Sequence, residues 1–359
     1  MQEHQHLPAD VCIWICQQRK RRANRILLRI RVQRVRIQQL FKLRSLMMNG
    51  TITIGTRGSK LALWQANWVR SALLEITPSL TIDLVVIKTK GDKILDAPLA
   101  KVGGKGLFVK EIEEALLEGR IDLAVHSMKD MPAAVPAGLT MGAIPKREIP
   151  YDVLISRHGQ RFSELTRSAC IGTSSLRRAA QIRHARSDII ILPLRGNLDT
   201  RLKKLDSDEQ RMDAIVVAAA GIKRLNFEDR IAEYLDETIM LPAVGQGALC
   251  IECRENDPMM ADILAELDDP ETRTVVMAER AYLNRLGGSC QVPIAGFGKI
   301  EKDTFFLSGL VADLDGKTLC RDSHSGPINR SENIAVVLAE RLMAMGADKI
   351  LEELKSYEL

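Results

Sequence analysis

The sequence lacks the features that would place a protein in or beyond a membrane. It contains no apolar run long enough to cross a bilayer. Its apolar stretch at residues 11–16 is too short for a signal-peptide core and precedes its positive charges instead of following them. The 7 cysteines are odd in number and have no repeating spacing, which argues against a secreted disulfide framework. We therefore expect a cytoplasmic protein with no membrane partner.

Motifs for metal, phosphate and triad chemistry are also missing. Cys250 and Cys253 form a CxxC, but their apolar segment indicates a strand, where residues three apart face opposite sides. A buried structural role is expected for both. The glycine-rich segment at 103–106 does not match a phosphate loop, because Leu99 stands where the first Gly is needed and no Ser or Thr follows Lys105. The histidines are scattered, so neither a metal site nor a Ser-His-Asp triad is expected.

Positive charge is concentrated at the start of the chain. The sequence has 51 Lys and Arg against 46 Asp and Glu, a formal net charge of +5. The first 50 positions hold 11 of the basic and 2 of the acidic residues, which leaves 40 basic and 44 acidic residues, a net charge of −4, in the remainder. The body of the protein is therefore slightly acidic, and no nucleic-acid partner is expected.

Residues 1–49 have no core-forming pattern. Three interpretations compete: a disordered basic tail, a targeting peptide, or sequence upstream of a true start at Met47 or Met48. We favour the last, because a complete domain begins directly after Met48 and a transit peptide would usually be richer in serine. A chain that begins at Met48 is expected to fold and function normally.

From residue 51 onward, the pattern predicts alternating strands and helices, typical of an open, mostly parallel sheet covered by helices. The first part is expected to contain a strand at 51–54, a helix at 61–76, a strand at 82–86, a helix ending near 119 and a strand at 121–125. One stripe of the helix at 61–76 is expected to carry its apolar residues, which are Leu61, Trp64, Trp68, Ala72 and Leu73.

A second set of the same kind starts near Tyr151. It is expected to contain a strand at 169–172, a helix from 174 or 175, a strand at 189–192, a helix from 198 and a strand at 214–218. Residues 241–247 look like a crossover. A third unit opens at Asp269 and Pro270 with a helix that ends near 287, and continues with a hairpin at 315–316 and a helix from Ser331. Three domains fit the length of 359 residues.

Cations follow the predicted strands at their carboxyl ends, where open α/β sheets bind ligands. These residues are Arg57, Lys129 (with Asp130), Arg177, Arg178, Arg195 and Arg201. Arginine pairs bidentately with carboxylates, and a helix that starts after serines offers N–H groups to an anion. Any single arginine is more simply a solvated surface charge. Several at strand ends predict a cleft between two α/β units that binds a ligand with several carboxylates.

Five segments, in order, resemble those of the hydroxymethylbilane synthase (porphobilinogen deaminase) family, and the resemblance covers residue 51 to the C-terminus. They are HSMKDMP at 126–132, GTSSLRR at 172–178, LRGN at 194–197 with Thr200 and Arg201, LPAVGQG at 241–247 and CQVP at 290–293. Ser289 replaces a glycine common in the family just before the cysteine.

The resemblance implies two similar doubly wound α/β domains, like those of periplasmic binding proteins, and a smaller α+β C-terminal domain. The implied domains are 50–147 with 246–266, then 148–245, then 267–359. The resemblance also implies that a dipyrromethane cofactor is attached to Cys290 through a thioether. On it, four porphobilinogens are joined with loss of ammonia, and the linear product is released by hydrolysis. Two alternative classes compete with this one. A pure binding protein of the periplasmic type would need a secretion signal and gives no reason for Cys290 in a Gly-Gly-Ser-Cys loop, and a nucleic-acid-binding protein would lose its affinity without residues 1–49.

Site roles follow from the same resemblance. Asp130 is implied to be catalytic, because its carboxylate can stabilise positive charge on pyrrole nitrogens. The implied cofactor-binding residues are Cys290, Lys129, Asp130, Thr173, Ser174, Ser175, Arg177, Arg178 and Arg201. The implied substrate-binding residues are Arg57, Ser59, Ser127, Arg195, Gly196, Gln246, Lys101 and Lys105, the two lysines lying in the family's flexible lid. A monomer that hands its product to the next pathway enzyme is expected.

Overall fold

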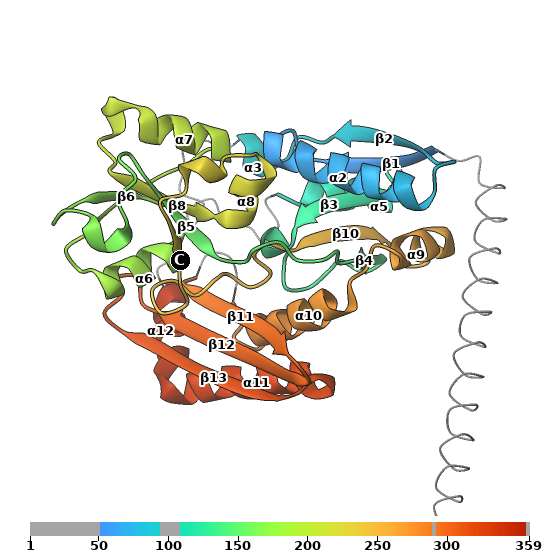
Figure 1. The fold of residues 1–359 in the computed structure, drawn as a ribbon. Coiled ribbons are helices and arrows are strands. Elements are labelled where there is room, and N and C mark those ends of the chain that lie inside the picture. Colours follow the sequence, from blue (N-terminus) through green and yellow to red (C-terminus); the bar gives the residue numbers. More distant parts are fainter. Residues whose placement is uncertain (1–50, 94–107, 289–291, 357–359) are drawn as a thin grey trace, which may run out of the picture. The chain divides into compact units, whose positions relative to one another are not determined.

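In the computed structural model, the described residues form three β-sheets (Figure 1). The structure describes residues 51–93, 108–288 and 292–356. Two of the sheets have five strands and the third has three. Within these described ranges, no helix is both long and apolar enough to cross a membrane.

The first sheet has the strand order β2-β1-β3-β10-β4. Strands β1 and β3 are parallel, whereas β10 is antiparallel to both β3 and β4. Helices α2 and α5 pack against β3, and α9 packs against β4. The bounds are β1 (Thr51–Thr56), α2 (Lys60–Ile76), β2 (Thr81–Val86), α3 (Lys90–Lys93), α5 (Lys110–Leu117), β3 (Leu123–Ser127), β4 (Leu139–Ala143), β10 (Leu249–Arg254) and α9 (Pro258–Ala265).

The second sheet has the matching order β7-β6-β8-β5-β9. Strand β6 is parallel to β7 and β8, and β5 is antiparallel to β8 and β9, so β5 takes the place that β10 has in the first sheet. The two sheets therefore confirm the predicted pair of similar α/β domains. The bounds are β5 (Asp152–Ser156), β6 (Cys170–Gly172), α6 (Leu176–Ala185), β7 (Ile190–Leu192), α7 (Leu198–Asp206), β8 (Ala214–Ala218), α8 (Ala219–Arg224) and β9 (Glu233–Leu235).

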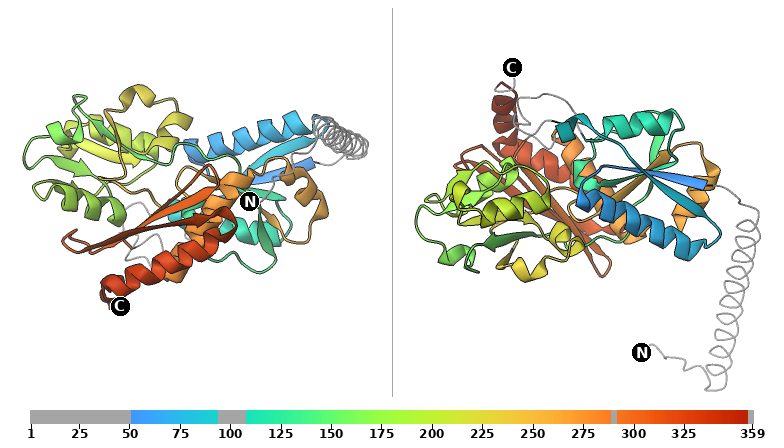
Figure 2. Two further views of the ribbon diagram at one scale, coloured as in Figure 1. Left: turned by 60° about the horizontal axis from the view of Figure 1, so that its bottom comes forward. Right: turned by 90° about the horizontal axis from the view of Figure 1, so that it is seen from above.

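The third sheet is an antiparallel meander, β11-β12-β13, and helices α10 and α11 pack against it (Figure 2). Asp269 starts α10 as predicted, because its carboxylate accepts the N–H of Thr272 at 2.8 Å and Pro270 follows at the first helical position. Tyr282 and Phe305 are fully buried in the core between these elements. The bounds are α10 (Pro270–Arg285), β11 (Ile294–Glu301), β12 (Thr304–Ala312), β13 (Leu319–Pro327), α11 (Ser331–Leu342) and α12 (Asp348–Ser356).

The chain passes from the first sheet to the second before β5 and returns before β10. The buried carboxylate of Glu279, on α10, binds both passages. It accepts Arg147 Nη1 at 2.7 Å from the outgoing segment and the Gly245 N–H at 2.6 Å from the returning one. Gly247 has a φ of +91°, and a Cβ there would lie 2.4 Å from the Glu148 carbonyl oxygen, so the two passages approach too closely for a side chain.

The stripe predicted on α2 is only partly correct. Trp68 is 39% exposed, and Trp64 is half-buried with the guanidinium of Arg224 5.9 Å from its ring. Neighbouring stripes of one helix share the same spacing, so periodicity does not decide which one faces the sheet. The smaller side chains lie inward because they allow closer packing. The buried residues of α2 are Gln65, Ala66, Val69 and Leu73.

The strand predicted at 82–86 forms as β2, but its expected alternation of buried residues is not observed. Ile82 is buried, Leu84 is half-buried and Val86 is 51% exposed. Strand β2 lies at the edge of the first sheet. An edge strand has a neighbour on one side only, so less of its surface is covered.

Candidate active site

The predicted cations do lie at the carboxyl ends of strands. In the first sheet, Arg57 follows β1, and Lys129 and Asp130 form a short 3₁₀ turn directly after β3. In the second sheet, Arg177 and Arg178 lie in the first turn of α6, which follows β6. Arg195 follows β7, and Arg201 lies in α7.

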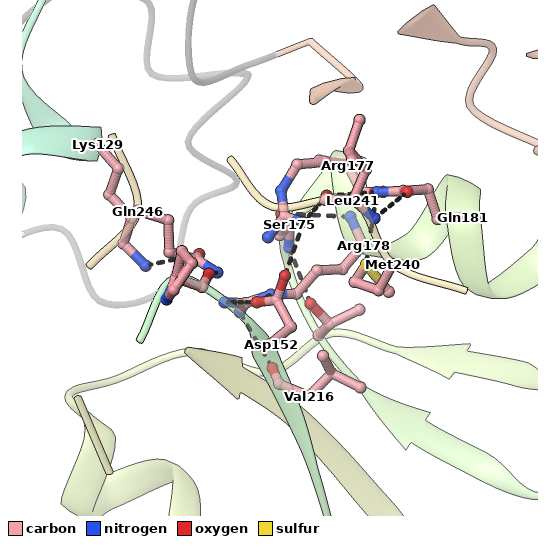
Figure 3. A network of polar contacts seen from close by, with 12 residues as sticks. Lys129, Asp152, Ser175, Arg177, Arg178, Gln181, Val216, Met240, Leu241 and Gln246 are labelled. Carbon is pink, nitrogen blue, oxygen red and sulfur yellow. Dashed lines mark hydrogen bonds and ion pairs between the residues drawn. The ribbon is translucent and has the colours of Figure 1, made fainter. Parts of the chain in front are cut away.

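A fully buried carboxylate holds the two arginines of α6 (Figure 3). Arg178 approaches Asp152 Oδ1 with Nε at 2.9 Å and Nη2 at 2.7 Å, while Arg177 Nη1 lies 2.8 Å from Oδ2. Burial alone would raise the pKa of Asp152, but the two arginines outweigh it and hold the pKa at about 2. Asp152 is therefore ionised at neutral pH and compensates part of the buried positive charge.

Further contacts fix both guanidinium groups. Arg178 Nη1 donates to the Val216 carbonyl at 3.0 Å, and Arg177 Nη1 donates to the Leu241 carbonyl at 2.7 Å. Gln181 binds the same Leu241 backbone, accepting its N–H at 2.7 Å and donating to its carbonyl at 3.2 Å. The arginine pair is thus built into the second sheet and the crossover, with little freedom to reorient.

Lys129, which follows β3 of the first sheet, lies close to this cluster. Burial, together with the charges of Arg178 and Arg177, lowers the pKa of Lys129 to about 8, although Asp130 and Asp152 act in the opposite direction. Its Nζ lies 3.5 Å from Gln246 Oε1. A lysine in this setting releases its proton far more readily than an exposed one.

Arg201 completes the cluster from α7. Burial and the charge of Arg178 lower its pKa to about 10, with Asp130 acting in the opposite direction. Its Nε donates to the carbonyl oxygen of Gly196 at 2.8 Å. Gly196 has a φ of +109°, a conformation that other residues rarely adopt. Arg195 also lowers the pKa of Arg201, which places it close to the same group.

Three hydroxyls at the start of α6 organise its backbone. Ser175 is the N-cap and accepts the Arg178 N–H at 3.5 Å. Thr173 Oγ1 accepts the Ser175 N–H at 3.2 Å, and Ser174 Oγ accepts the Leu194 N–H at 3.1 Å. Each oxygen acts as an acceptor here, so its hydroxyl hydrogen remains chemically suited to donate to an anion.

The predicted substrate-binding residues are more dispersed. Arg57 pairs with Asp92, whose Oδ1 lies 2.5 Å from Arg57 Nη2. Ser59 Oγ accepts the Ala62 N–H at 3.2 Å near the start of α2. Ser127 Oγ accepts Gln65 Nε2 at 3.0 Å. The structure does not place these side chains directly against the cluster around Asp152.

Gln246 is fully buried. Its Nε2 donates to the Pro150 carbonyl at 2.6 Å, while its Oε1 faces Lys129. In this structure it therefore supports Lys129 from within the crossover. A direct contact between Gln246 and substrate stays a prediction.

Cys290, Lys101 and Lys105 lie outside the described residues, so their roles also stay predictions. Cys250 and Cys253 are buried in β10, in agreement with their predicted structural role. Burial raises the pKa of both thiols, to about 11 for Cys253, which keeps them protonated and poorly nucleophilic at neutral pH. Across residues 51–93, 108–288 and 292–356, no group of three or more His, Cys, Asp and Glu has the arrangement of a metal site.

Sequence reasoning missed the carboxylates that partner the arginines. Asp152 begins a buried strand and is followed by three apolar residues, and that isolated charge was the available signal. Asp92 lies in the four-residue helix α3 and offered no comparable signal. Neither residue belongs to the five segments that resemble the family.

Two models of one family match the chain. The model for "Porphobilinogen deaminase, dipyromethane cofactor binding domain" matches residues 52–262, and the model for "Porphobilinogen deaminase, C-terminal domain" matches residues 273–344. A porphobilinogen deaminase of Syntrophotalea carbinolica is 53% identical over 308 residues, which is 86% of this chain and 97% of that protein. One from Geobacter metallireducens is 52% identical over 308 residues, covering 86% and 96%.

Solved structures share only a distant likeness. A periplasmic binding protein of Salmonella typhimurium is 16% identical with a TM-score of 0.35, covering 62% of this chain and 96% of that one. The BenM effector-binding domain with benzoate is 15% identical with a TM-score of 0.36, covering 60% and 89%.

Proposed function

Because the chain belongs to the porphobilinogen deaminase family, we propose that it joins four porphobilinogens head to tail, with loss of ammonia, and releases linear hydroxymethylbilane by hydrolysis. The protein is an enzyme, a transferase of tetrapyrrole biosynthesis, and residues 52–262 match the family's dipyrromethane-binding domain. The resemblance found in the sequence is thereby confirmed, as are the enzyme class and the cofactor.

The observation that carries the proposal is the charge balance of the cluster. The cluster contains five cations and two carboxylates, which leaves a net charge of +3. The cations are Lys129, Arg177, Arg178, Arg195 and Arg201, and the carboxylates are Asp130 and Asp152. A dipyrromethane built from two porphobilinogens carries an acetate and a propionate on each ring, and so four negative charges. A cationic, partly buried site suits such a ligand, because charge-assisted hydrogen bonds are strong where water is excluded. The residues present fit the cofactor.

We assign the holding of cofactor carboxylates to Lys129, Arg177, Arg178 and Arg201, helped by the hydroxyls of Thr173, Ser174 and Ser175. When bound, the dipyrromethane supplies the free α-carbon from which the product grows. Cys290 is assigned as its covalent attachment point. The other assigned contacts, with incoming substrate or growing product, are Arg57, Ser59, Ser127, Arg195, Gly196, Gln246, Lys101 and Lys105.

Asp130 is assigned as the catalytic residue. Loss of ammonia from porphobilinogen leaves an electron-poor azafulvene, and positive charge develops on pyrrole nitrogens as the new carbon–carbon bond forms. The Asp130 carboxylate is exposed at the end of β3, next to Lys129. There it can accept pyrrole N–H groups and stabilise their charge without first having to reorganise.

The domain limits also remain part of the proposal. We place them at 50–147 with 246–266, at 148–245 and at 267–359. The position of β10 between β3 and β4 supports the first, discontinuous domain. We further propose that the enzyme is a cytoplasmic monomer that passes its product to the next enzyme of the pathway.

Intact-mass measurement of the purified protein tests the proposal. We expect an adduct equal to two porphobilinogens less two ammonia molecules, and consumption of added porphobilinogen with release of ammonia. Cys290→Ala should remove both adduct and activity while the protein remains folded by circular dichroism. An unmodified mass together with no turnover after incubation of wild-type protein with porphobilinogen would contradict the proposal.

A further inference from the structure

The guanidinium group of Arg57 is held along one edge and over one face. Asp92 Oδ1 accepts Nε at 3.1 Å and Nη2 at 2.5 Å, so a single carboxylate oxygen serves both nitrogens. The centre of the Phe108 ring lies 4.2 Å from the Arg57 Cζ atom. An edge contact fixes the direction of the guanidinium plane, and a stacked ring limits its tilt.

Asp92 is itself anchored through its other oxygen. Asp92 Oδ2 accepts the backbone N–H of Thr89 at 3.2 Å and the Thr89 hydroxyl at 2.8 Å. Thr89 is fully buried. Burial acts to raise the pKa of Asp92, but the bonds from Arg57 and Thr89 outweigh it and hold the pKa below its ordinary value. The carboxylate is therefore charged at neutral pH and is attached to the fold independently of Arg57.

The contact uses only one of the two carboxylate-binding edges of arginine. Nε and Nη2 form the side-on edge, which Asp92 occupies. Nη1 and the second hydrogen of Nη2 form the end-on edge, which is a separate fork for a carboxylate. An anchored carboxylate on the first edge thus determines where the second edge points.

We infer that Asp92 is a positioning residue for substrate binding, which aims the end-on edge of Arg57 at a carboxylate of porphobilinogen. This inference rests on the proposed role of Arg57 in binding substrate. Asp92 does not act as a competitor that substrate must displace, because the two bonds from Thr89 keep it in place whether or not Arg57 moves. Holding Arg57 before substrate arrives reduces the entropy lost on binding.

The test compares two aspartates with matched surroundings. Asp122 accepts Arg254 Nη2 at 2.9 Å and the Thr53 N–H at 2.9 Å, and its pair with Arg254 is about as exposed as the pair of Asp92 with Arg57. Arg254 is not among the proposed site residues. Asp92→Asn and Asp122→Asn therefore remove the same kind of contact from the same domain, but only Asp92→Asn loosens Arg57.

We expect Asp92→Asn to raise KM for porphobilinogen about tenfold, the scale of one lost charge-assisted contact, with a smaller change in kcat. Asp122→Asn should leave KM unchanged. In a double-mutant cycle, Arg57→Lys should cost less in kcat/KM when Asp92→Asn is already present, because lysine has no fork for Asp92 to aim; equal costs would mean that Asp92 does not act through Arg57. Mass spectra of the holoenzyme at limiting porphobilinogen should show fewer substrate additions for Asp92→Asn than for wild type.

Thr89→Val keeps Asp92 but removes the hydroxyl that anchors it, and it should raise KM by a smaller factor. This variant also tests the inference if Asp92→Asn does not fold. An unchanged KM in both variants would overturn the inference, and a lowered KM would show that Asp92 competes with substrate. Wild-type enzyme without turnover would instead refute the proposed function, so the two failures are distinguishable.

Discussion

The arginines of the two five-stranded sheets differ in how their charge is compensated. Arg177 and Arg178 are buried and pair with Asp152, which is fully buried, and they also donate hydrogen bonds to main-chain carbonyls. Arg57 is partly exposed and pairs through one edge with Asp92, whose side chain is 26% exposed. The same sequence feature, an arginine after a strand, has therefore produced two physically different sites.

The difference lies in what each carboxylate does for the protein. Removing a carboxylate from beneath two buried cations leaves charge that no water can solvate. Removing one from beside a partly exposed cation leaves water to replace it. We therefore expect the loss of Asp152 to lower both stability and activity. The loss of Asp92 should weaken substrate binding with little effect on stability.

The largest expected effect is that of Asp152→Asn. It should lower the free energy of unfolding by about 3–5 kcal/mol, because Arg177 and Arg178 remain buried without a counter-charge. Urea unfolding of this variant beside Asp92→Asn measures the difference between the two sites directly. Asp206→Asn, at an exposed pair with Arg230, serves as the control and should change stability much less. Equal losses at Asp152 and Asp92 would remove the distinction between the two sites.

Asp130→Asn tests an exposed charge that acts on both Lys129 and Arg201. Chain extension should slow by about a hundredfold or more, because the charge that stabilises pyrrole cations is lost while the shape is kept. Unfolding should be nearly unchanged, since Asp130 is exposed. Asp130→Glu should retain part of the rate. Single-turnover kinetics on protein with its adduct mass confirmed give the measurement, and normal extension in the Asn variant would exclude Asp130 from the mechanism.

Lys129 should make both the stability of the cluster around Asp152 and its binding of carboxylates depend on pH. With a folded pKa of about 8 against an ordinary 10.5, the unfolded chain binds more protons between these values, so this group's contribution to the free energy of unfolding rises with pH there. The affinity for carboxylates should instead fall as pH rises, because binding needs Lys129 to be protonated. We expect loading of apoprotein by porphobilinogen to slow about fivefold, the scale of one weakened charge contact, from pH 7.5 to 9.5.

Lys129→Arg is the matched variant, since arginine stays charged throughout this range. Its loading rate, followed by intact mass, should lose most of the pH dependence. Retention of the full pH dependence in Lys129→Arg would assign the effect to another group.

The smallest effect on activity is expected for Cys250→Ala combined with Cys253→Ala. Both thiols are buried in β10, and their raised pKa values make them poor nucleophiles. Stability should fall by about 1–2 kcal/mol from the lost packing. The adduct mass and the turnover of the remaining protein should match wild type, and peptide mapping that finds the adduct on either cysteine would contradict the assignment to Cys290.

Much of the architecture could be predicted because it depends on local rules. The start of α10 follows from an aspartate cap and a proline, and β8 was predicted with its observed limits, 214–218. The burial pattern of α2 was harder. Its two candidate stripes have the same spacing, and the choice between them depends on what packs against the helix.

The sequence by itself determined the alternation of strands and helices, the placement of cations at strand ends and, through its five segments, the family. Each depends on neighbours along the chain or on a match of residues in order. Only the tertiary structure decided which carboxylates compensate those cations. Asp152 of β5 meets Arg177 and Arg178 of α6, and Asp92 meets Arg57 across 35 positions of sequence. Long-range pairing and burial set the strength of a charge, and neither has a local signature in the sequence.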